Sequence, residues 1–227
     1  MNSAPTLVIF DIDGTLVDST AAHHAALTKA LRGFGLDPMA KPWNAYRHYT
    51  DSGVLDELYS DARGIGATPA ELSRLDIEMR REFETLIRTR PLAEIAGASQ
   101  VLEELNAAAD MRCSFATGSM RGAAALKLQA LGLDAEAQIL STGSEFFSRE
   151  QIVRQVLSEG MRRFGLGFNT VLLGDGAWDE KVARALDIAF VGVETGLHVF
   201  GPGADLIVPD LTCLTTMSLR TVARSFA

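Results

Sequence analysis

The chain has 227 residues, of which 47% are hydrophobic and 22% charged, an ordinary composition for a globular protein long enough to bury a real core. Its net charge of −8 disfavours non-specific binding to nucleic acid or to an acidic membrane. No apolar run approaches the roughly 18 residues of a membrane span, and the run at the N-terminus is too short for a signal peptide. The two cysteines show no metal-binding spacing and require no disulfide. From these features together we expect a cytoplasmic protein. We also expect a monomer or a homodimer.

Short apolar runs rich in β-branched residues recur along the chain, as expected for strands that are buried on both faces. The runs cover residues 6–10, 113–117, 137–140, 170–174, 188–193 and, more weakly, 205–209. Amphipathic helical patterns lie between them, such as the face shared by Val101, Leu102 and Leu105. This alternation predicts an α/β fold, a doubly wound parallel sheet with helices on both sides.

The stretch from residue 19 to residue 90 interrupts this alternation, because it contains no strand-like run. One long helix is predicted there from a capping box, with Thr68 as N-cap, Pro69 at the first helical position and Glu71 closing the box. Its apolar stripe consists of Leu72, Leu75, Met79, Phe83 and Leu86. We therefore expect residues 19–90 to form an inserted all-helical domain, with the α/β core built from residues 1–18 and 91–227.

Polar residues follow three of the predicted strands, at the edge of the sheet where ligands bind in open α/β folds. The first strand is followed by Asp11 and Asp13, and the strand at 170–174 by Asp175. Carboxylates gathered on one edge repel each other unless a cation lies among them, and hard oxygen ligands select Mg²⁺. Thr117-Gly118-Ser119 ends a third strand, where backbone amides opening the next helix favour an anion. Together these residues predict a site for Mg²⁺ and a phosphate group.

The motifs also carry a family resemblance. FDIDGTLVDS (10–19) resembles the first motif of the haloacid dehalogenase (HAD) superfamily in its phosphatase branch, FATGS (115–119) the second, and LLGDGAWD (172–179) the fourth. An isolated D-x-D is weak evidence, but D-x-D-G-T after an apolar strand, with the other two motifs in order, is specific. The resemblance covers essentially the whole chain and points to phosphoglycolate phosphatase-like members. The helical insert is similar to the C1-type cap of these members.

The resemblance implies a role for each acidic residue. Asp11 would be the nucleophile that forms an aspartyl-phosphate, and Asp13 would protonate the leaving oxygen and then activate the hydrolytic water. Asp175 would bind Mg²⁺ together with Asp11 and the backbone carbonyl of Asp13, while Asp179 would hold the metal or its waters. The alternative, in which Asp11 and Asp13 only cap a turn, leaves Asp175 and Asp179 unexplained.

The phosphoryl oxygens would be held by Thr117 and the amide of Gly118, with Ser119 either a further contact or only a helix N-cap. The family's third motif is usually a Lys, and here it is missing. FFSREQIV (146–153) instead places Arg149 in the first turn of an amphipathic helix capped by Ser148. Because a cation there opposes the helix dipole, we predict that Arg149 replaces the Lys, the alternative being a solvated surface residue.

Substrate selection is expected in the cap segment RHYTDSGVLDEL (47–58), a polar loop leading into apolar residues. The candidates for substrate contact are Arg47, Thr50, Asp51 and Ser52, unless the segment is only an exposed helix connection. His23 shares a helical face with Leu27, so we expect it to pack at the boundary between cap and core, although some sugar-phosphate mutases carry a His near this spacing. His24 is expected to face solvent.

Three functions remain open from the sequence. The first is a Mg²⁺-dependent phosphatase of a small phosphorylated metabolite, with the cap as a lid; Asp13 favours it, since the dehalogenase and phosphonatase branches lack an Asp there. The second is a sugar phosphomutase of the β-phosphoglucomutase type. The third is a phosphate-binding or interaction protein that has lost catalysis, supported only by the missing Lys. The substrate stays open between phosphoglycolate, a sugar phosphate and a nucleotide.

Overall fold

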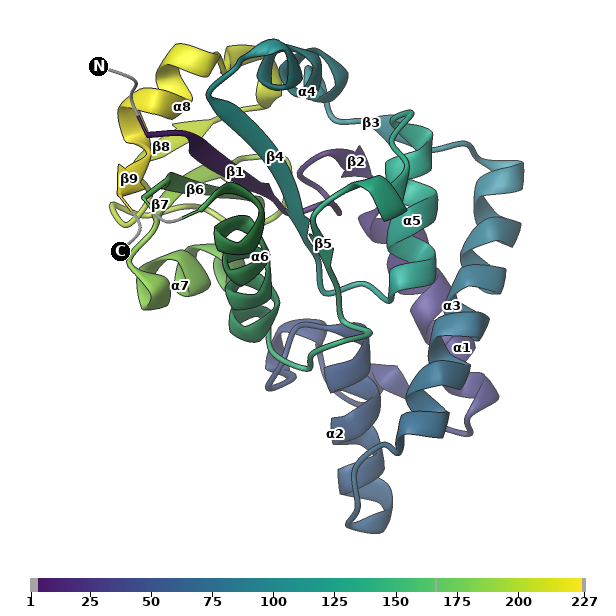
Figure 1. Cartoon of the computed structure of the whole chain (residues 1–227). Coiled ribbons are helices and arrows are strands. Elements are labelled where there is room, and N and C mark those ends of the chain that lie inside the picture. Colours follow the sequence, from purple (N-terminus) through teal and green to yellow (C-terminus); the bar gives the residue numbers. More distant parts are fainter. Residues whose placement is uncertain (1–3, 166, 226–227) are drawn as a thin grey trace.

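The computed structural model describes residues 4–165 and 167–225, and its centre is a seven-stranded sheet (Figure 1). Six strands are parallel in the order β5-β4-β1-β6-β7-β8, and the short β9 pairs antiparallel with β6. Their bounds are β1 Thr6–Phe10, β4 Met111–Ala116, β5 Leu140–Ser141, β6 Asn169–Gly174, β7 Ala189–Val193, β8 Leu206–Val208 and β9 Arg224–Ser225. The predicted parallel sheet is confirmed.

Helices cover both faces of this sheet, because alternate residues of each strand point to opposite sides. Val8 and Phe10 of β1 pack into a core with α4, α5 and α8, whereas Leu7 and Ile9 pack into a second core with α6 and α7. The bounds of these helices are α4 Ala98–Ala107, α5 Arg121–Ala130, α6 Arg149–Phe164, α7 Ala177–Leu186 and α8 Thr216–Val222, with single 3₁₀ turns at Ala135–Ala137 and Leu211–Cys213. The doubly wound α/β architecture is therefore as predicted.

The direction of winding reverses at β1. From β1 the chain crosses to β4 and β5 on one side, and then returns to β6, β7 and β8 on the other. The carboxyl ends of β1, β4 and β6 therefore meet at a topological switch point, where open α/β sheets bind their ligands. The backbone N–H of Asp11 donates to the carbonyl of Leu173 at 2.9 Å, which keeps the chain after β1 beside the end of β6.

The helical insert leaves and rejoins the core through a two-stranded antiparallel sheet of β2 (Val17–Asp18) and β3 (Ala93–Glu94). Between them lie α1 Thr20–Gly33, α2 Asp51–Arg63 and α3 Pro69–Thr89, with 3₁₀ turns at Pro38–Ala40 and Trp43–Ala45. Leu31, Leu55 and Leu75 are fully buried in a separate apolar core, which Ala123 of α5 and its N-cap residue Met120 complete. The helical nature of the insert and the capping box at Thr68 are confirmed, and the domain limits at residues 18/19 and 90/91 stay a prediction.

Two strand predictions need correction. The predicted strand at 113–117 begins earlier, at Met111, and ends at Ala116. The predicted strand at 137–140 is wrong, because only Leu140–Ser141 pairs with β4. The Asp134 side chain accepts a hydrogen bond from the N–H of Glu136 and starts a 3₁₀ turn at Ala135–Ala137, so local turn formation outweighs the apolar pattern.

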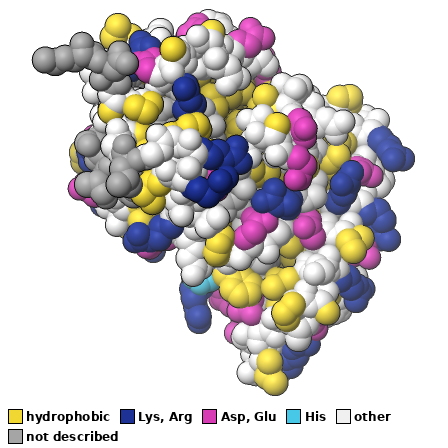
Figure 2. Space-filling model, viewed as in Figure 1, with side chains coloured by type: hydrophobic (Ala, Val, Ile, Leu, Met, Phe, Trp, Pro, Cys, Tyr) yellow, Lys and Arg dark blue, Asp and Glu magenta, His cyan; other side chains and the backbone are white. Residues whose placement is uncertain are grey.

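Charged side chains of both signs are interspersed on the face of the molecule seen in Figure 2. On this face the described residues form no continuous basic stripe of the kind that binds nucleic acid. Within residues 4–165 and 167–225, no helix combines the length and the apolar character needed to cross a membrane.

Candidate active site

Three carboxylates meet at the switch point. Asp11 after β1 and Asp175 and Asp179 after β6 each place one oxygen so that the three oxygens lie within 4.8 Å of one another, and all three residues are buried. Burial raises the pKa of all three, to about 7 for Asp175, where the charge of Asp11 adds to the effect. Asp11 Oδ2 and Asp175 Oδ1 are buried without a hydrogen-bond partner among the described residues. Oxygens left unpaired in a cluster of acids fit a hard divalent cation such as Mg²⁺.

Gly14 makes the close approach of these acids possible. Its φ is +78°, in the left-handed region, and a Cβ at this position would lie 2.3 Å from Asp175 Oδ2. Only glycine fits both conditions, so the glycine of the first motif is a packing requirement of the acidic cluster.

Arg149 lies beside the nucleophile candidate. It is the first residue of α6, and its Nη1 donates to Asp11 Oδ1 at 2.6 Å and to Asp179 Oδ1 at 3.4 Å. Its Nε donates to the carbonyl of Tyr49 in the cap at 3.1 Å, and 11% of the side chain is exposed. A solvated surface Arg is thereby excluded, and the cation stands next to Asp11, where the sequence reasoning placed a substitute for the missing Lys.

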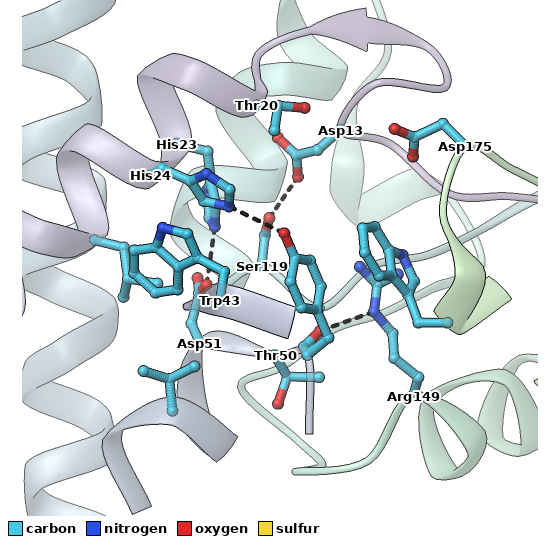
Figure 3. A pocket seen from close by; sticks show the side chains of 15 residues that line it. Asp13, Thr20, His23, His24, Trp43, Thr50, Asp51, Ser119, Arg149 and Asp175 are labelled. Atoms are coloured by element: carbon cyan, nitrogen blue, oxygen red, sulfur yellow. Dashed lines mark hydrogen bonds and ion pairs between the residues drawn. The ribbon is translucent and has the colours of Figure 1, made fainter. Parts of the chain in front are cut away.

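Asp13 bonds to a different set of residues from those around Asp11. Its carboxylate accepts from Ser19 Oγ at 2.5 Å, from Ser119 Oγ at 2.7 Å and from Lys127 Nζ at 2.6 Å (the Ser119 bond is drawn in Figure 3). Burial acts to raise the pKa of Asp13, but the ammonium of Lys127, the ring of His23 and the hydrogen bonds from Lys127 and Ser19 together outweigh burial and hold that pKa below its ordinary value. Asp13 is therefore held as a carboxylate on the side of α5.

Lys127 was missed by the sequence reasoning. It lies on α5 and is 0% exposed, on the same buried helical face as Ala123, Ala124 and Leu128. A Lys in the middle of an apolar helical face was the available signal, since lysine is almost never fully buried unless it is paired.

A chain of polar contacts continues from Lys127 into the cap. Lys127 Nζ lies 3.0 Å from His23 Nδ1, and His23 Nε2 lies 2.8 Å from Asp51 Oδ1. Because an ammonium only donates, Nδ1 must accept, so Nε2 carries the proton and donates to Asp51. Asp51 Oδ2 in turn accepts from the N–H of Met120 at 2.8 Å, on the core. His23 thus lies at the boundary of cap and core, as expected.

The other predicted cap residues lie in two different surroundings. Thr50 caps α2 and donates to the carbonyl of Phe147 at 2.6 Å, and Ser52 donates to the carbonyl of Phe146 at 3.4 Å. These bonds, like that of Asp51, dock α2 onto the core. Arg47 is exposed and does not line the pocket, and its backbone N–H donates to the Glu57 carboxylate.

The residues of the second motif support the same docking. Thr117 is fully buried, and its hydroxyl accepts from the N–H of Ser119 at 3.1 Å. The carbonyl of Gly118 accepts from the N–H of Asp51 at 2.9 Å, and a Cβ on Gly118 would lie 2.6 Å from the carbonyl oxygen of Tyr49. Gly118 and Ser119 line the pocket beside Arg149.

A cavity of about 60 Å³ lies between this edge and the cap (Figure 3). Two aromatic pairs line it: Tyr49 stacks on Trp178 with ring centroids 3.8 Å apart, and His24 stacks on Trp43 at 4.8 Å. Tyr49 Oη lies 3.2 Å from His24 Nε2, which joins the two pairs. The expectation that His24 faces solvent is wrong, because the ring of Trp43 covers it.

Comparison with known proteins identifies the family of this chain. A family model for haloacid dehalogenase-like hydrolases matches residues 8–193, from β1 to the end of β7. The chain belongs to this family. As an enzyme of the HAD family, it is 26% identical over 223 residues to phosphoglycolate phosphatase of Agrobacterium fabrum, covering 95% of this chain and 94% of the relative.

Solved structures agree on the fold of this HAD hydrolase. A hydrolase from Pseudomonas syringae superposes with a TM-score of 0.72 at 24% identity, over 96% of this chain and 100% of that one. A β-phosphoglucomutase from Clostridium difficile superposes with a TM-score of 0.68 at 16% identity, over 95% of each chain. The resemblance to phosphoglycolate phosphatase-like members of the superfamily, predicted from the motifs, is confirmed.

Proposed function

We propose that the protein is a Mg²⁺-dependent phosphatase that hydrolyses a small phosphate monoester through an aspartyl-phosphate on Asp11. The observation that carries this proposal is the state of Asp11: one carboxylate oxygen is bonded to Arg149, and the other is buried beside Asp175 and Asp179 with no hydrogen-bond partner among the described residues. A carboxylate with a purely structural role would have both oxygens satisfied, whereas an oxygen without a protein partner is open to Mg²⁺ or to phosphorus.

The metal ligands in this proposal are Asp11, Asp175, Asp179 and the backbone carbonyl of Asp13. When bound there, Mg²⁺ would offset the repulsion between the carboxylates and the incoming phosphate. Arg149 adds a second positive charge at the nucleophile, and its planar guanidinium suits phosphoryl oxygens.

The reaction then takes two displacements. A carboxylate oxygen of Asp11 bonds to phosphorus as the ester P–O bond breaks. Asp13, a carboxylate in the resting site, takes up a proton from solvent as the ester binds and passes it to the leaving oxygen. Water next attacks the phosphorus and gives its proton to Asp13, so that phosphate leaves and the Asp11 carboxylate is restored. Thr117, the amide of Gly118 and Ser119 are proposed to hold the phosphoryl oxygens. The cap would exclude bulk water during transfer.

The test is Mg²⁺-dependent hydrolysis of p-nitrophenyl phosphate. We expect Asp11→Asn to abolish it, because an amide cannot act as the nucleophile. The control is Asp61→Asn, which changes an exposed carboxylate on α2 and should leave the rate unchanged. Undiminished turnover by a clean Asp11→Asn preparation would contradict the assignment, and no turnover by the wild type would favour a binding protein that has lost catalysis.

A sugar phosphomutase is the second candidate, favoured by the position of His23 and by the structural likeness to a β-phosphoglucomutase. Both ring nitrogens of His23 are occupied, by Lys127 and by Asp51, which leaves neither free for a sugar hydroxyl. Exchange of phosphorus between two sugar positions without net phosphate release is the assay that would favour the mutase. A cytoplasmic location and a monomeric or homodimeric state stay predictions.

A further inference from the structure

The pocket above Asp13 has an unusual charge balance for a site that binds anions. Among the described residues that line it, Arg149 is the only Lys or Arg, and its guanidinium is already bonded to Asp11 and Asp179. Three carboxylates line the same pocket, those of Asp13, Asp51 and Asp175. The charge of Arg149 is directed at Asp11, where the phosphoryl group would bind. The opposite end of the pocket, lined by the aromatic residues, would hold the leaving group, and no Lys or Arg among the described residues lines that end.

The other titratable groups facing the pocket do not supply that charge. His23 lies between Lys127 and Asp51, and both of its nitrogens are engaged. Lys127 itself is fully buried behind Asp13 and Ser119 and does not line the cavity. Burial lowers the pKa of His24 and raises the pKa of Tyr49 to about 12, so both side chains are neutral near pH 7.

The walls at the leaving-group end are flat and apolar. The aromatic residues Trp43, Tyr49 and Trp178 line the cavity together with the aliphatic residues Leu27 and Val54. The free-energy cost of desolvation is small when such walls contact an uncharged group. A carboxylate placed there would lose its water, meet no free cation among the described lining residues and lie near the carboxylates of Asp13 and Asp51.

We infer that the substrate's leaving group is uncharged, so that the pocket selects neutral-bodied phosphate monoesters and rejects esters with a second carboxylate or phosphate. Phosphoglycolate belongs to the rejected class, although one relative is named for it. This inference rests on the proposed phosphatase function and adds the substrate class to it.

The test compares esters that differ only in this second charge. The first pair is 2-hydroxyethyl phosphate against 2-phosphoglycolate, and the second is phenyl phosphate against 4-carboxyphenyl phosphate, each with Mg²⁺. We expect kcat/KM to favour the neutral member of each pair by at least about 100-fold, since a buried charge without a partner is strongly rejected. Equal or better hydrolysis of the charged members would overturn the inference while leaving the phosphatase function intact.

A variant that supplies the missing cation sharpens the test. Trp43→Lys puts an ammonium at the pocket wall, at a residue that is only half-buried, and Trp43→Met removes the ring without adding charge. We expect Trp43→Lys to raise kcat/KM for 2-phosphoglycolate at least about tenfold over Trp43→Met, with no such gain for 2-hydroxyethyl phosphate. An equal change for both esters would overturn the charge argument. Absence of Mg²⁺-dependent hydrolysis of all four esters by the wild type would instead overturn the proposed function, and the inference with it.

Discussion

Replacing Lys127 by methionine is the most informative single change to the core of this protein. Lys127 is 0% exposed, and its ammonium bonds to Asp13, to Ser119 Oγ and to His23 Nδ1. Methionine keeps much of the volume and removes the charge. The carboxylate of Asp13, with 14% of its side chain exposed, would then lack its cation, and His23 would lose the donor to Nδ1.

The expected cost follows from the burial of the pair. Removing one partner of a buried ion pair costs about 3–5 kcal/mol, because the remaining charge stays desolvated. Asp13 retains two hydroxyl donors, so we expect a value near the lower end, about 3 kcal/mol of unfolding free energy.

Urea denaturation of the metal-free protein measures this cost. The matched control is Lys181→Met, an exposed lysine on α7, whose replacement should change the unfolding free energy by no more than about 0.5 kcal/mol. The double variant Asp13→Asn with Lys127→Met removes both charges and should be more stable than the sum of the single changes predicts, by about 1–3 kcal/mol. A cost for Lys127→Met below about 1 kcal/mol, with additive single changes, would refute the view that this ammonium holds Asp13.

Two further predictions concern the acidic cluster. Gly14→Ala should destabilise the protein more than Gly35→Ala and should weaken Mg²⁺ binding measured by calorimetry. Both glycines have positive φ (+78° and +76°), but only at Gly14 would a Cβ meet the Asp175 carboxylate. Equal effects of the two substitutions would contradict the packing argument. Without metal, stability should fall as pH rises from about 4 to about 7, because the folded pKa of Asp175 is about 7 against an ordinary value of 3.8 and the folded state therefore binds the extra proton in that window. Melting temperatures across this range in EDTA and in Mg²⁺ check the sign, and a metal-free profile that rises with pH there would count against it.

The sequence predicted the sheet and its acidic edge because both depend on local patterns. A strand buried on both faces is a continuous apolar run, and Asp11 and Asp175 follow such runs directly. Arg149 was also predictable, since a cation in the first turn of a helix opposes the helix dipole and calls for another reason to be there.

What the sequence did not predict depends on contacts between distant segments. Lys127 bonds to Asp13, 114 residues away, and no local pattern specifies that pairing. Thr50 bonds to the backbone of Phe147, 97 residues away, so its docking role could not be separated from substrate binding by inspection of the loop. The predicted strand at 137–140 was wrong for the opposite reason. A local 3₁₀ turn at Ala135–Ala137 forms where the apolar pattern predicted a strand.

The proposed replacement of the family's usual Lys by Arg149 has a consequence for the cap. The two ends of the guanidinium reach different partners: Nη1 bonds to Asp11 and Asp179 in the core, and Nε bonds to the carbonyl of Tyr49 in the cap. A lysine ammonium is a single nitrogen and donates from one point, so it cannot extend along a planar fork in this way. Tyr49 also stacks on Trp178 and bonds to His24, which makes it part of the wall around the leaving group. Arg149 therefore links the charge beside Asp11, the proposed nucleophile, to the position of the aromatic wall.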